Sequence, residues 1–558
     1  MKMEGEEVRI GIFVCHCGSN IGGVMDCKAL VKYASTLPDV VYTEDNLYTC
    51  SEVGLNQIKD AIKEHNLNRV IVASCTPRTH ESLFRDTIQE VGLNPYLFEM
   101  ANIRDQCSWV HMKDKEKATE KAKDLLRMAV GKAKMLEPLE KIKVGVTPAA
   151  AVIGGGIAGI TAATNLLHQG FNVFLLEKTN QLGGIINRLY KLYPSNELGT
   201  EFIQKKIEYI QNHPNIEVLT NATIKSVYGF VGEYDLEVEV NNSTKKLRAG
   251  TIIIATGAQV LDAQYVQEFK GENVINQADL ELQLKNKTFD AKNVVMVQCA
   301  GARIDERPYC SNICCMTALK NALLIKEQSP DSHVTILYRD VQTLGTKYEE
   351  TYQKARESRI LFVKYSPEKN PIVENDHVKV YSELSGGKEI SIPRDLIVLS
   401  TPLVANPDSK ELAQFFKVPL EENQFFLEAH VKLRPVDFAT DGVYVCGCTK
   451  WPADIPETIS QAYAASSRAS TVLSHETFEV EGSTAKILDK SKCVGCEICI
   501  KICPFGAIIK NEEDEVDIIQ VLCHGCGTCG ATCPHKAITV SHFTTEQIIS
   551  QIHSFGGD

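Results

Sequence analysis

The sequence lacks any apolar run that approaches the length needed to cross a bilayer, so we expect no membrane span. It also lacks a basic excess, because 59 Lys and Arg face 71 Asp and Glu and the formal net charge is −12. A general nucleic-acid-binding protein would present a basic face, so we expect no nucleic-acid partner. The first residues, MKMEGEEVRIGIFVC, carry acids where a signal peptide would carry bases, and we expect a cytoplasmic protein.

Cysteine, in contrast, is abundant, with 20 residues in the chain. In a cytoplasmic protein these thiols do not readily form a disulfide framework, because the cytosol keeps them reduced. Their grouping along the sequence indicates metal binding instead. At 558 residues the chain is also too long for a single hydrophobic core, so several domains are expected.

The front of the chain alternates strand-like and helix-like stretches. Strands are expected at 8–14 and 69–73, and helices at 51–64, 79–91 and 115–135. This alternation predicts an N-terminal α/β domain with a mostly parallel sheet over residues 1–135, followed by a linker at 136–148.

The α/β pattern continues over residues 149–480, where we expect the largest domain. Its strands are expected at 149–153, 172–176, 251–255, 294–297, 334–337, 396–399 and 442–445, with a β-meander at 216–240. A cysteine-dense α+β module with an internal repeat is expected at 481–542. The tail, 543–558, is expected to hold a short helix and a Gly-rich end.

The internal repeat has the spacing C-x2-C-x2-C-x3-C-P, found twice. In this spacing three thiolates on a tight loop face one [4Fe–4S] cube and the fourth reaches the other cube. One expected ligand set is Cys493, Cys496, Cys499 and Cys533, and the other is Cys523, Cys526, Cys529 and Cys503. A pair of zinc knuckles is the alternative, but zinc gives no reason for this spacing to occur twice. The segment resembles the bacterial two-cluster ferredoxins.

A dinucleotide-binding fingerprint opens the large domain. Gly154, Gly156 and Gly159 follow an apolar strand and begin a helix, and Glu177 closes the second strand, where an acid accepts hydrogen bonds from ribose hydroxyls. The helix N-terminus would supply N–H groups to the phosphates. The alternative is a Rossmann domain that holds NAD alone.

Two later segments favour FAD over NAD. The stretch 252–257 (IIIATG) resembles a strand and turn of two-dinucleotide flavoproteins, and 442–447 (GVYVCG), followed by a helix at 458–469, resembles their final FAD segment. Cys448 stands where such proteins carry an acid. The residues expected to contact FAD are Gly154, Gly156, Gly159, Glu177, Lys178, Gly184, Ala255, Thr256, Gly257, Gly447, Cys448 and Ile459. The fold class predicted for this domain is a two-part, thioredoxin-reductase-like domain of Rossmann type.

The second glycine fingerprint, which binds NAD(P)H in thioredoxin-reductase-like enzymes, is absent after the strand at 293–297. Cysteines follow instead: Cys299, Cys310, Cys314 and Cys315. Four thiolates at the carboxyl end of a parallel strand can hold a cluster. A redox disulfide such as Cys310–Cys314, or plainly buried cysteines, are the alternatives.

The fingerprint, the Cys-Cys pair and the C-terminal ferredoxin module together resemble HdrA, the iron–sulfur flavoprotein of heterodisulfide reductase. The resemblance implies a [4Fe–4S] cluster on the Cys299–Cys315 set and places a catalytic lysine, Lys320, near the flavin. An ammonium there would favour anionic reduced flavin. The alternative is an exposed lysine on a helix at 316–326.

The same resemblance extends to FVCHCGSNIGG, Cys50, VIVASCTPRTHE and NIRDQCSWVH near the N-terminus. It implies a fourth cluster held by Cys17, Cys50, Cys75 and Cys107, with Cys15 or His16 as substitutes. Ordinary buried cysteines are the alternative, and Cys27 is expected in the core. Longer family members carry a ferredoxin insertion that 225–250 lacks, so four clusters are expected rather than six.

The resemblance implies a subunit that carries out electron bifurcation with FAD and clusters. Its implied partners are cysteine-rich and ferredoxin-like subunits, a hydrogenase or formate dehydrogenase, soluble ferredoxin and a second copy of the chain. The residues alone support a two-electron flavin connected to one-electron clusters. The competing hypotheses are a self-contained NAD(P)H oxidoreductase similar to the small subunit of glutamate synthase, a thiol–disulfide reductase using Cys310 or Cys314, and a structural hub.

Overall fold

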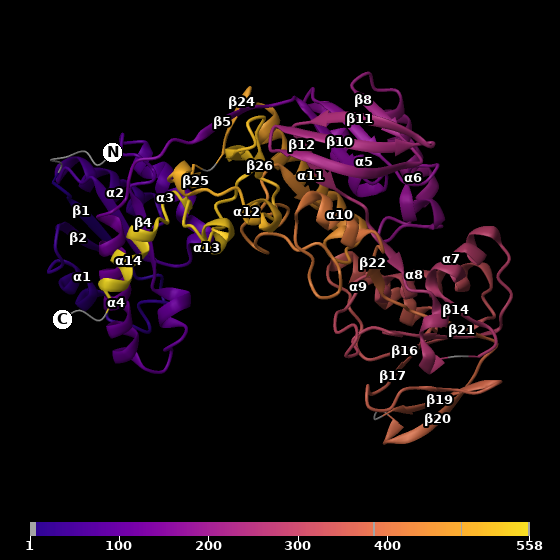
Figure 1. Ribbon diagram of the computed structural model, residues 1–558. Helices are drawn as coiled ribbons and strands as arrows, with labels where there is room; N and C mark the ends of the chain where they lie inside the picture. Colours follow the sequence, from indigo (N-terminus) through magenta and orange to yellow (C-terminus); the bar gives the residue numbers. More distant parts are fainter. Residues whose placement is uncertain (1–6, 270, 383–384, 481, 556–558) are drawn as a thin grey trace. The chain divides into compact units, whose positions relative to one another are not determined.

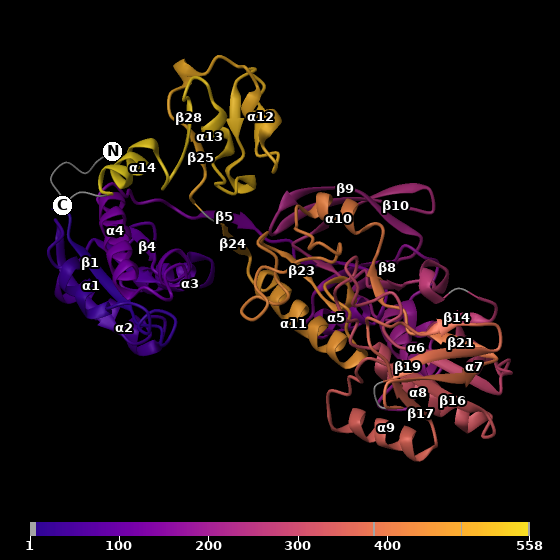
Figure 2. The same cartoon turned by 90° about the horizontal axis from the view of Figure 1, so that it is seen from below.

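The computed structural model describes residues 7–269, 271–382, 385–480 and 482–555. The chain forms two compact units: unit 1 comprises Met1–Lys143 and Glu479–Asp558, and unit 2 comprises Val144–Phe478. Figures 1 and 2 show the elements of each unit. Within the described residues, no helix is long and apolar enough to cross a membrane. The expected domain start at 481 and the tail's last residues, 556–558, lie outside the described residues.

The N-terminal part of unit 1 is a parallel four-stranded sheet in the order β2-β1-β3-β4. Its strands are β1 (Ile10–Cys15), β2 (Val40–Asn46), β3 (Arg69–Ser74) and β4 (Phe98–Asn102). The helices are α1 (Cys27–Ala34), α2 (Glu52–Glu64), α3 (Pro77–Gln89) and α4 (Lys115–Ala133). Because side chains alternate along a strand, Ile12 and Val14 of β1 pack with α1 and α4, whereas Phe13 packs with α2 and α3. The sheet is therefore covered on both faces.

The C-terminal part of unit 1 is built as a repeated small motif. It contains β25 (Ala485–Ile487), α12 (Ile498–Ile502), β26 (Ile508–Lys510), β27 (Val516–Ile518), α13 (Thr528–Thr532) and β28 (Ile538–Val540). Antiparallel pairs join β25 to β28 and β26 to β27. The predicted α+β character of this module is confirmed.

The last helix, α14 (Thr545–His553), packs along α4, as both ribbon views show. Ser550 donates its hydroxyl to the carbonyl of Gly131 at 2.7 Å, and the Gln547 amide donates to the carbonyl of Met135 at 3.0 Å. A side chain at Gly131 would collide with the Ser554 hydroxyl, because an added Cβ would lie 2.2 Å away. The tail thus closes unit 1 by packing on its N-terminal part.

A buried ionic cluster accompanies this packing. The Lys132 ammonium lies 2.8 Å from the Glu99 carboxylate, and His542 Nε2 lies 3.7 Å from the same carboxylate. His542 is 4% exposed and lies edge-on to Tyr96. Burial lowers the pKa of His542 to about 3, and the charges of Lys132 and Arg85 contribute to this lowering. The imidazole is therefore neutral at neutral pH.

Unit 2 contains two parallel sheets. The first has the order β23-β12-β6-β7-β8 and is formed by β6 (Ala149–Ile153), β7 (Asn172–Leu176), β8 (Ile216–Leu219), β12 (Thr251–Ile254) and β23 (Val443–Val445). Helices α5 (Ile157–His168), α6 (Gly199–Gln211) and α11 (Ile455–Leu473) cover it. The meander consists of β9 (Ala222–Phe230), β10 (Glu233–Val240) and β11 (Ser243–Ala249). The prediction of a meander from residue 216 was wrong, since 216–219 pairs parallel with β7 and completes the sheet.

The second sheet has the order β14-β21-β15-β16-β17. Its strands are β14 (Val274–Asn276), β15 (Asn293–Val297), β16 (His333–Tyr338), β17 (Leu361–Lys364) and β21 (Leu396–Leu399). Helices α7 (Gln277–Asn286), α8 (Cys314–Gln328) and α9 (Thr346–Glu357) pack on it. The remaining elements are β13 (Ala258–Val260), paired with β22 (Leu403–Ala405), the strands β18 (Ile372–Val373), β19 (His377–Ser382) and β20 (Lys388–Pro393), and α10 (Ser409–Phe416).

Short strands also lie near the ends of unit 2. β5 spans Ile142–Gly145, inside the segment expected to be a linker, and β24 spans Thr477–Val480.

Candidate flavin and iron–sulfur sites

The glycine fingerprint occupies the turn between β6 and α5. A Cβ at Gly159 would lie 1.8 Å from the carbonyl oxygen of Gly154, so only glycine allows the helix to approach the turn this closely. At Gly156 an added Cβ would meet no atom within 4 Å. The protein therefore leaves open space in front of the N-terminus of α5, as a bound pyrophosphate requires.

Glu177 follows β7 and supports this turn. Its carboxylate accepts hydrogen bonds from the Gly155 N–H at 2.8 Å and from the Thr179 N–H at 2.8 Å. The side chain is buried, with 9% of the residue exposed. The neighbouring Lys178 points elsewhere, since its ammonium pairs with Asp408 at 2.9 Å.

The other expected FAD segments meet at the carboxyl ends of β12 and β23. The Thr449 hydroxyl accepts a hydrogen bond from the Gly257 N–H at 2.7 Å and lies 3.4 Å from the Thr256 hydroxyl. The Asn406 amide donates to the carbonyls of Thr256 and Gly257 at 2.8 and 3.0 Å. Ala255 is buried at the end of β12. Thr449 and Asn406 had not been expected from the sequence, because no local motif marks either residue.

The segment after β23 leads into α11. The Gly447 N–H donates to the Gln461 side chain at 2.9 Å, and Ile459 packs against the core that holds α5. The Cys448 thiol donates to the carbonyl of Ala453 at 3.2 Å, and burial raises its pKa. Cys448 is thus a neutral hydrogen-bond donor where related flavoproteins carry an acid.

Gly184 begins a short 3-10 turn beside the fingerprint. Its backbone has φ of 55°, and an added Cβ would lie 3.1 Å from the Cα of Gly156. The structure therefore brings Gly184 next to the glycine turn, as a shared cofactor site requires.

Four cysteines line one small cavity at the carboxyl end of β15. Cys299, Cys310, Cys314 and Cys315 all contribute to its wall, together with Gln298, Ser311, Arg303 and Asp340. Burial raises the pKa of the Cys315 thiol to about 12, and the sulfurs of Cys299 and Cys310 contribute to this rise. The chain thus collects in one place the four thiols that the spacing grouped together.

Polar groups surround this cavity. Arg303 pairs with Asp340 at 2.7 Å and donates to the Cys299 sulfur at 4.0 Å. The Asn312 N–H donates to the Cys310 sulfur at 3.4 Å. A guanidinium and a backbone N–H beside thiolate sulfurs offset part of the charge that an iron–sulfur cluster would bring.

Lys320 lies on α8 but is not the exposed lysine of the alternative interpretation. Its ammonium pairs with the Glu281 carboxylate and donates to the carbonyl of Lys191 at 2.9 Å. Lys320 is 7% exposed and Glu281 only 1%. Burial lowers the pKa of Lys320, while Glu281 opposes that shift. No sequence motif marks Glu281, because it lies on α7 and only the fold brings the two together.

Cysteines also gather at the carboxyl edge of the N-terminal sheet. Burial raises the pKa of the Cys50 thiol, and the sulfurs of Cys15, Cys75 and Cys17 contribute to this rise. Burial likewise raises the pKa of Cys17, with added contributions from Cys15 and Cys75. The structure therefore brings together Cys15, Cys17, Cys50 and Cys75.

Cys107, expected with Cys17, Cys50 and Cys75, is placed differently. Its thiol is fully buried in the core formed with α4 and donates to the carbonyl of Ala118 at 2.9 Å. His16, a possible substitute ligand, lies 2.8 Å from the Asp45 carboxylate. Cys27 is buried in the core.

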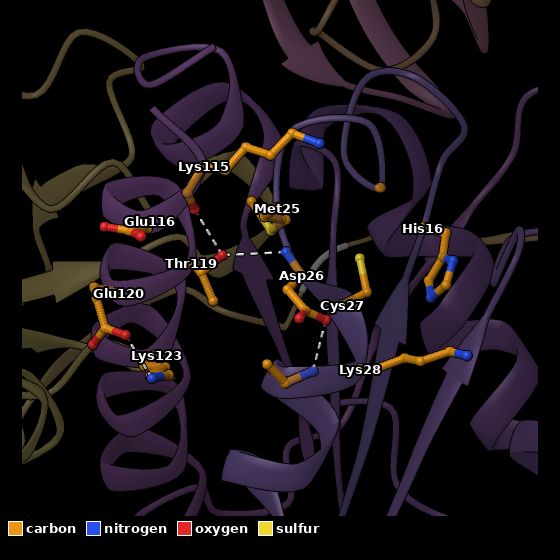
Figure 3. Close-up of a pocket in the computed structure, with 12 residues that line it drawn as sticks. His16, Met25, Asp26, Cys27, Lys28, Lys115, Glu116, Thr119, Glu120 and Lys123 are labelled. Carbon is orange, nitrogen blue, oxygen red and sulfur yellow. Dashed lines mark hydrogen bonds and ion pairs between the residues drawn. The ribbon is translucent and has the colours of Figure 1, made fainter. Parts of the chain in front are cut away.

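A cavity of about 780 Å³ opens beside His16 and Cys27. Figure 3 shows His16 and Cys27 on one side, with Lys115, Thr119 and Lys123 of α4 on the other. The Asp26 N–H donates to the Thr119 hydroxyl at 3.2 Å and so joins the start of α1 to α4. Half of the residues that line this cavity are charged.

The C-terminal cysteines form two groups. Burial raises the pKa of Cys529 to about 11, and the sulfurs of Cys523, Cys526 and Cys503 contribute to this rise. Cys503 thus lies with the second triplet, as the crossed ligand pattern requires. Backbone N–H groups of Ala485 and Ala507 donate to the sulfurs of Cys523 and Cys503 at 3.2 and 3.4 Å.

The Cys499 thiol has a raised pKa, first through burial and then through Cys496 and Cys493 of its own triplet. The Ala537 N–H donates to the Cys533 sulfur at 3.3 Å. Within the described ranges, no three His, Cys, Asp or Glu side chains are arranged to hold a single metal ion.

Two family models match the chain. The model described as pyridine nucleotide-disulphide oxidoreductase matches residues 148–469, and the one described as 4Fe-4S dicluster domain matches residues 492–538. Among solved structures, thioredoxin reductase of T. acidophilum is similar at 19% identity and a TM-score of 0.40, covering 59% of this chain and 98% of that one. Thioredoxin reductase of Lactococcus lactis is similar at 16% identity and a TM-score of 0.42, covering 59% and 99%.

Curated relatives match over nearly their whole length. The HdrA protein of the H(2):CoB-CoM heterodisulfide,ferredoxin reductase from Methanothermobacter thermautotrophicus is 37% identical over 98% of this chain and 97% of that protein. An iron-sulfur HdrA protein of the CoB--CoM heterodisulfide reductase from Methanopyrus kandleri is 36% identical, covering 98% of both chains. A heterodisulfide reductase HdrA-like protein from Archaeoglobus profundus is 34% identical, covering 99% of both.

The fold and the matching families define an oxidoreductase subunit that uses FAD and [4Fe–4S] clusters. The predicted fold class is confirmed. The chain belongs to the HdrA family of heterodisulfide reductase iron–sulfur subunits. The alignment with the Methanothermobacter relative extends over 646 positions, more than the 558 residues of this chain, so that relative carries further residues within the aligned range.

Proposed function

We propose that this chain is the flavin subunit of a heterodisulfide-reductase-like complex and that it divides electron pairs between two acceptors. The cavity lined by Cys299, Cys310, Cys314 and Cys315 carries the proposal, because it lies at the end of β15, where related enzymes bind a nicotinamide. FAD supplies two-electron chemistry and the clusters supply one-electron steps. A flavin beside a one-electron centre, with no nicotinamide fingerprint, suits the division of electron pairs.

We assign four cluster sites to the chain. One is held by the four cysteines of the β15 cavity, and two are held by the crossed sets of the C-terminal module. For the N-terminal site we infer that Cys15 joins Cys17, Cys50 and Cys75, because the nearby sulfurs of Cys15 and Cys75 contribute to the raised pKa of both Cys17 and Cys50. Cys107 instead donates to a carbonyl in the core.

The partners we propose follow from the relatives' names. The name of one relative includes H(2), and that of another, from Methanococcus maripaludis, includes H(2)/formate. We infer a hydrogenase or a formate dehydrogenase as electron donor, cysteine-rich and ferredoxin-like partner subunits, soluble ferredoxin as one acceptor, and a second copy of this chain within the complex. We expect this assembly in the cytoplasm.

The test uses the complex purified from native cells. With its donor present, ferredoxin reduction is followed with and without a disulfide acceptor. We expect ferredoxin reduction only when the second acceptor is also being reduced. Ferredoxin reduction at an equal rate without that acceptor would overturn the division of electron pairs.

A self-contained NAD(P)H oxidoreductase predicts a different result. Under our proposal, stopped-flow mixing of the lone protein with NADPH leaves the flavin oxidised on the time scale of turnover. Rapid flavin bleaching would favour the competing NAD(P)H oxidoreductase.

A thiol–disulfide reductase using Cys314 predicts an unchanged iron content in Cys314→Ala. We expect instead the loss of about four irons, the content of one cluster.

A further inference from the structure

Gln298, the residue directly after β15, has a buried side chain without a hydrogen-bond partner. The residue is 1% exposed. Its backbone is well held, since the N–H donates to the carbonyl of Leu337 at 2.9 Å and the carbonyl accepts from the Tyr365 hydroxyl at 2.7 Å. Both Nε2 and Oε1 of its amide are buried and unpartnered. The cost therefore falls on the side chain alone.

That cost is large enough to need an explanation. Each buried polar atom without a partner costs about 1–3 kcal/mol, and folded proteins satisfy nearly all such atoms. An apolar side chain of similar size would avoid the penalty. A glutamine in this position indicates that a partner outside the chain's own atoms completes its hydrogen bonds.

Gln298 is one of the residues that line the four-cysteine cavity. Other polar side chains of that wall are already engaged: Arg303 pairs with Asp340, and the Ser311 hydroxyl accepts from the Leu403 N–H at 3.0 Å. Gln298 thus offers a free N–H donor to whatever occupies the cavity. A [4Fe–4S] cluster held by the four cysteines would present sulfur acceptors to this donor.

We propose that the Gln298 amide donates a hydrogen bond to a sulfur of the cluster held by Cys299, Cys310, Cys314 and Cys315 and so raises that cluster's reduction potential. This inference rests on the proposed cluster site. One-electron reduction adds negative charge to the cluster sulfurs, and an N–H donor stabilises the reduced form more than the oxidised form. Gln298 is therefore a positioning residue that sets how readily the centre beside the flavin accepts an electron.

The test is Gln298→Met in the full-length, cluster-loaded protein, since methionine keeps the length of the side chain and removes the N–H donor. Iron and sulfide contents should equal those of the wild type. In an EPR-monitored redox titration, the ratio of reduced to oxidised cluster at a fixed potential should fall roughly tenfold, which is 59 mV for a one-electron couple.

Gln277→Leu is the matched control. Gln277 is also buried in unit 2, but its amide is fully engaged, because it donates to the Ser400 hydroxyl at 3.2 Å and accepts from the Asn321 amide at 2.9 Å. This variant should lose stability and leave the cluster's potential unchanged. If Gln298→Met does not fold, Gln298→Leu removes the same donor in a smaller side chain.

The outcomes separate this inference from the proposed function. A full cluster content with an unaltered potential in the Gln298 variant overturns the hydrogen bond but not the cluster. Full iron content in Cys314→Ala overturns the cluster site itself. A lowered potential in the Gln298 variant but not in Gln277→Leu supports both the hydrogen bond and the cluster site.

Discussion

The ammonium of Lys320 is buried against the carboxylate of Glu281, which joins the helix that starts with the Cys314–Cys315 pair to the helix before it. The Glu281 carboxylate also accepts from the Tyr190 N–H at 2.8 Å, and Lys320 donates to the carbonyl of Lys191. This buried ion pair therefore connects the segment that contains Tyr190 and Lys191 to α8, the helix that begins with two cysteines of the cavity.

Removing one charge of this pair should destabilise unit 2. Lys320→Met leaves the Glu281 carboxylate buried and unpaired, at a cost of about 3–5 kcal/mol. The double variant Lys320→Met/Glu281→Leu should recover much of that loss, because no charge is then left alone. Chemical unfolding followed by flavin fluorescence measures both. Equal loss in the single and double variants would contradict a coupled pair.

The same variants test the catalytic role expected of Lys320. If its charge acts on the flavin, both the single and the double variant should shift the flavin potentials at unchanged iron content. An unaltered redox titration in both would leave Lys320 with a structural role only.

Substitutions at Gly156 and Gly159, two of the three fingerprint glycines, should have different effects. Gly156→Ala should fold normally, because no protein atom lies within 4 Å of the new methyl group, yet purify with little FAD. Gly159→Ala forces the methyl group onto the Gly154 carbonyl and should lower the thermal stability as well. FAD content and the melting temperature of the stripped protein distinguish them. Full FAD content in Gly156→Ala would contradict this placement of the pyrophosphate.

Cys15 and Cys107 should exchange the roles expected from the sequence. Cys15→Ala should lose about four irons, the content of one cluster, together with the EPR signal of that cluster. Cys107→Ala should keep all its iron and lose about 1–3 kcal/mol, since it leaves the Ala118 carbonyl without its thiol donor. Iron analysis together with unfolding measurements decides. Loss of iron in Cys107→Ala but not in Cys15→Ala would support the ligand set that includes Cys107.

His542 should make the packing of α14 on α4 sensitive to acid. Its pKa in the folded state is about 3, so as the pH falls below about 6.5 the unfolded chain binds a proton that the folded chain does not. As far as His542 is concerned, the folded state therefore keeps its full stability above about pH 6.5 and loses stability progressively as the pH falls toward 3. Between pH 7 and 5.5 the loss is about 1 kcal/mol.

Hydrogen exchange of the α14 amides, expressed as protection factors, measures this loss. His542→Phe should remove the pH dependence, because phenylalanine fits beside Tyr96 and Phe543 and does not titrate. The exposed His553→Gln on the same helix is the control and should behave as the wild type. Equal pH dependence in all three would exclude His542 as its origin.

Most of the core strands could be predicted from the sequence. The strands at 149–153, 172–176 and 396–399 were observed with the expected bounds, because buried parallel strands are short, continuous apolar runs between turns. The strand at 216–219 was misassigned, since its residues alternate much like those of the antiparallel meander that follows. The sequence alone did not show that it would pair with β7.

The site was predictable where its residues are close in sequence. The spacing around Cys299–Cys315 grouped four thiols that do line one cavity. The expected N-terminal ligands Cys17, Cys50, Cys75 and Cys107 follow four different strands, and which of them meet depends on how each loop leaves the sheet. Glu281, Thr449 and Asn406 depend on contacts between distant segments, and the packing of the tail on α4 is equally non-local.

Unit 1 is assembled from the two ends of the chain, whereas unit 2 is one uninterrupted segment between them. During synthesis the flavin-binding segment emerges whole, while the N-terminal part of unit 1 must wait for α14 to pack on α4. The N-terminal cysteines therefore emerge before the unit that contains them is complete. A premature stop between residue 478 and α14 would leave the whole flavin-binding segment joined to a unit 1 whose α4 surface lacks its covering helix.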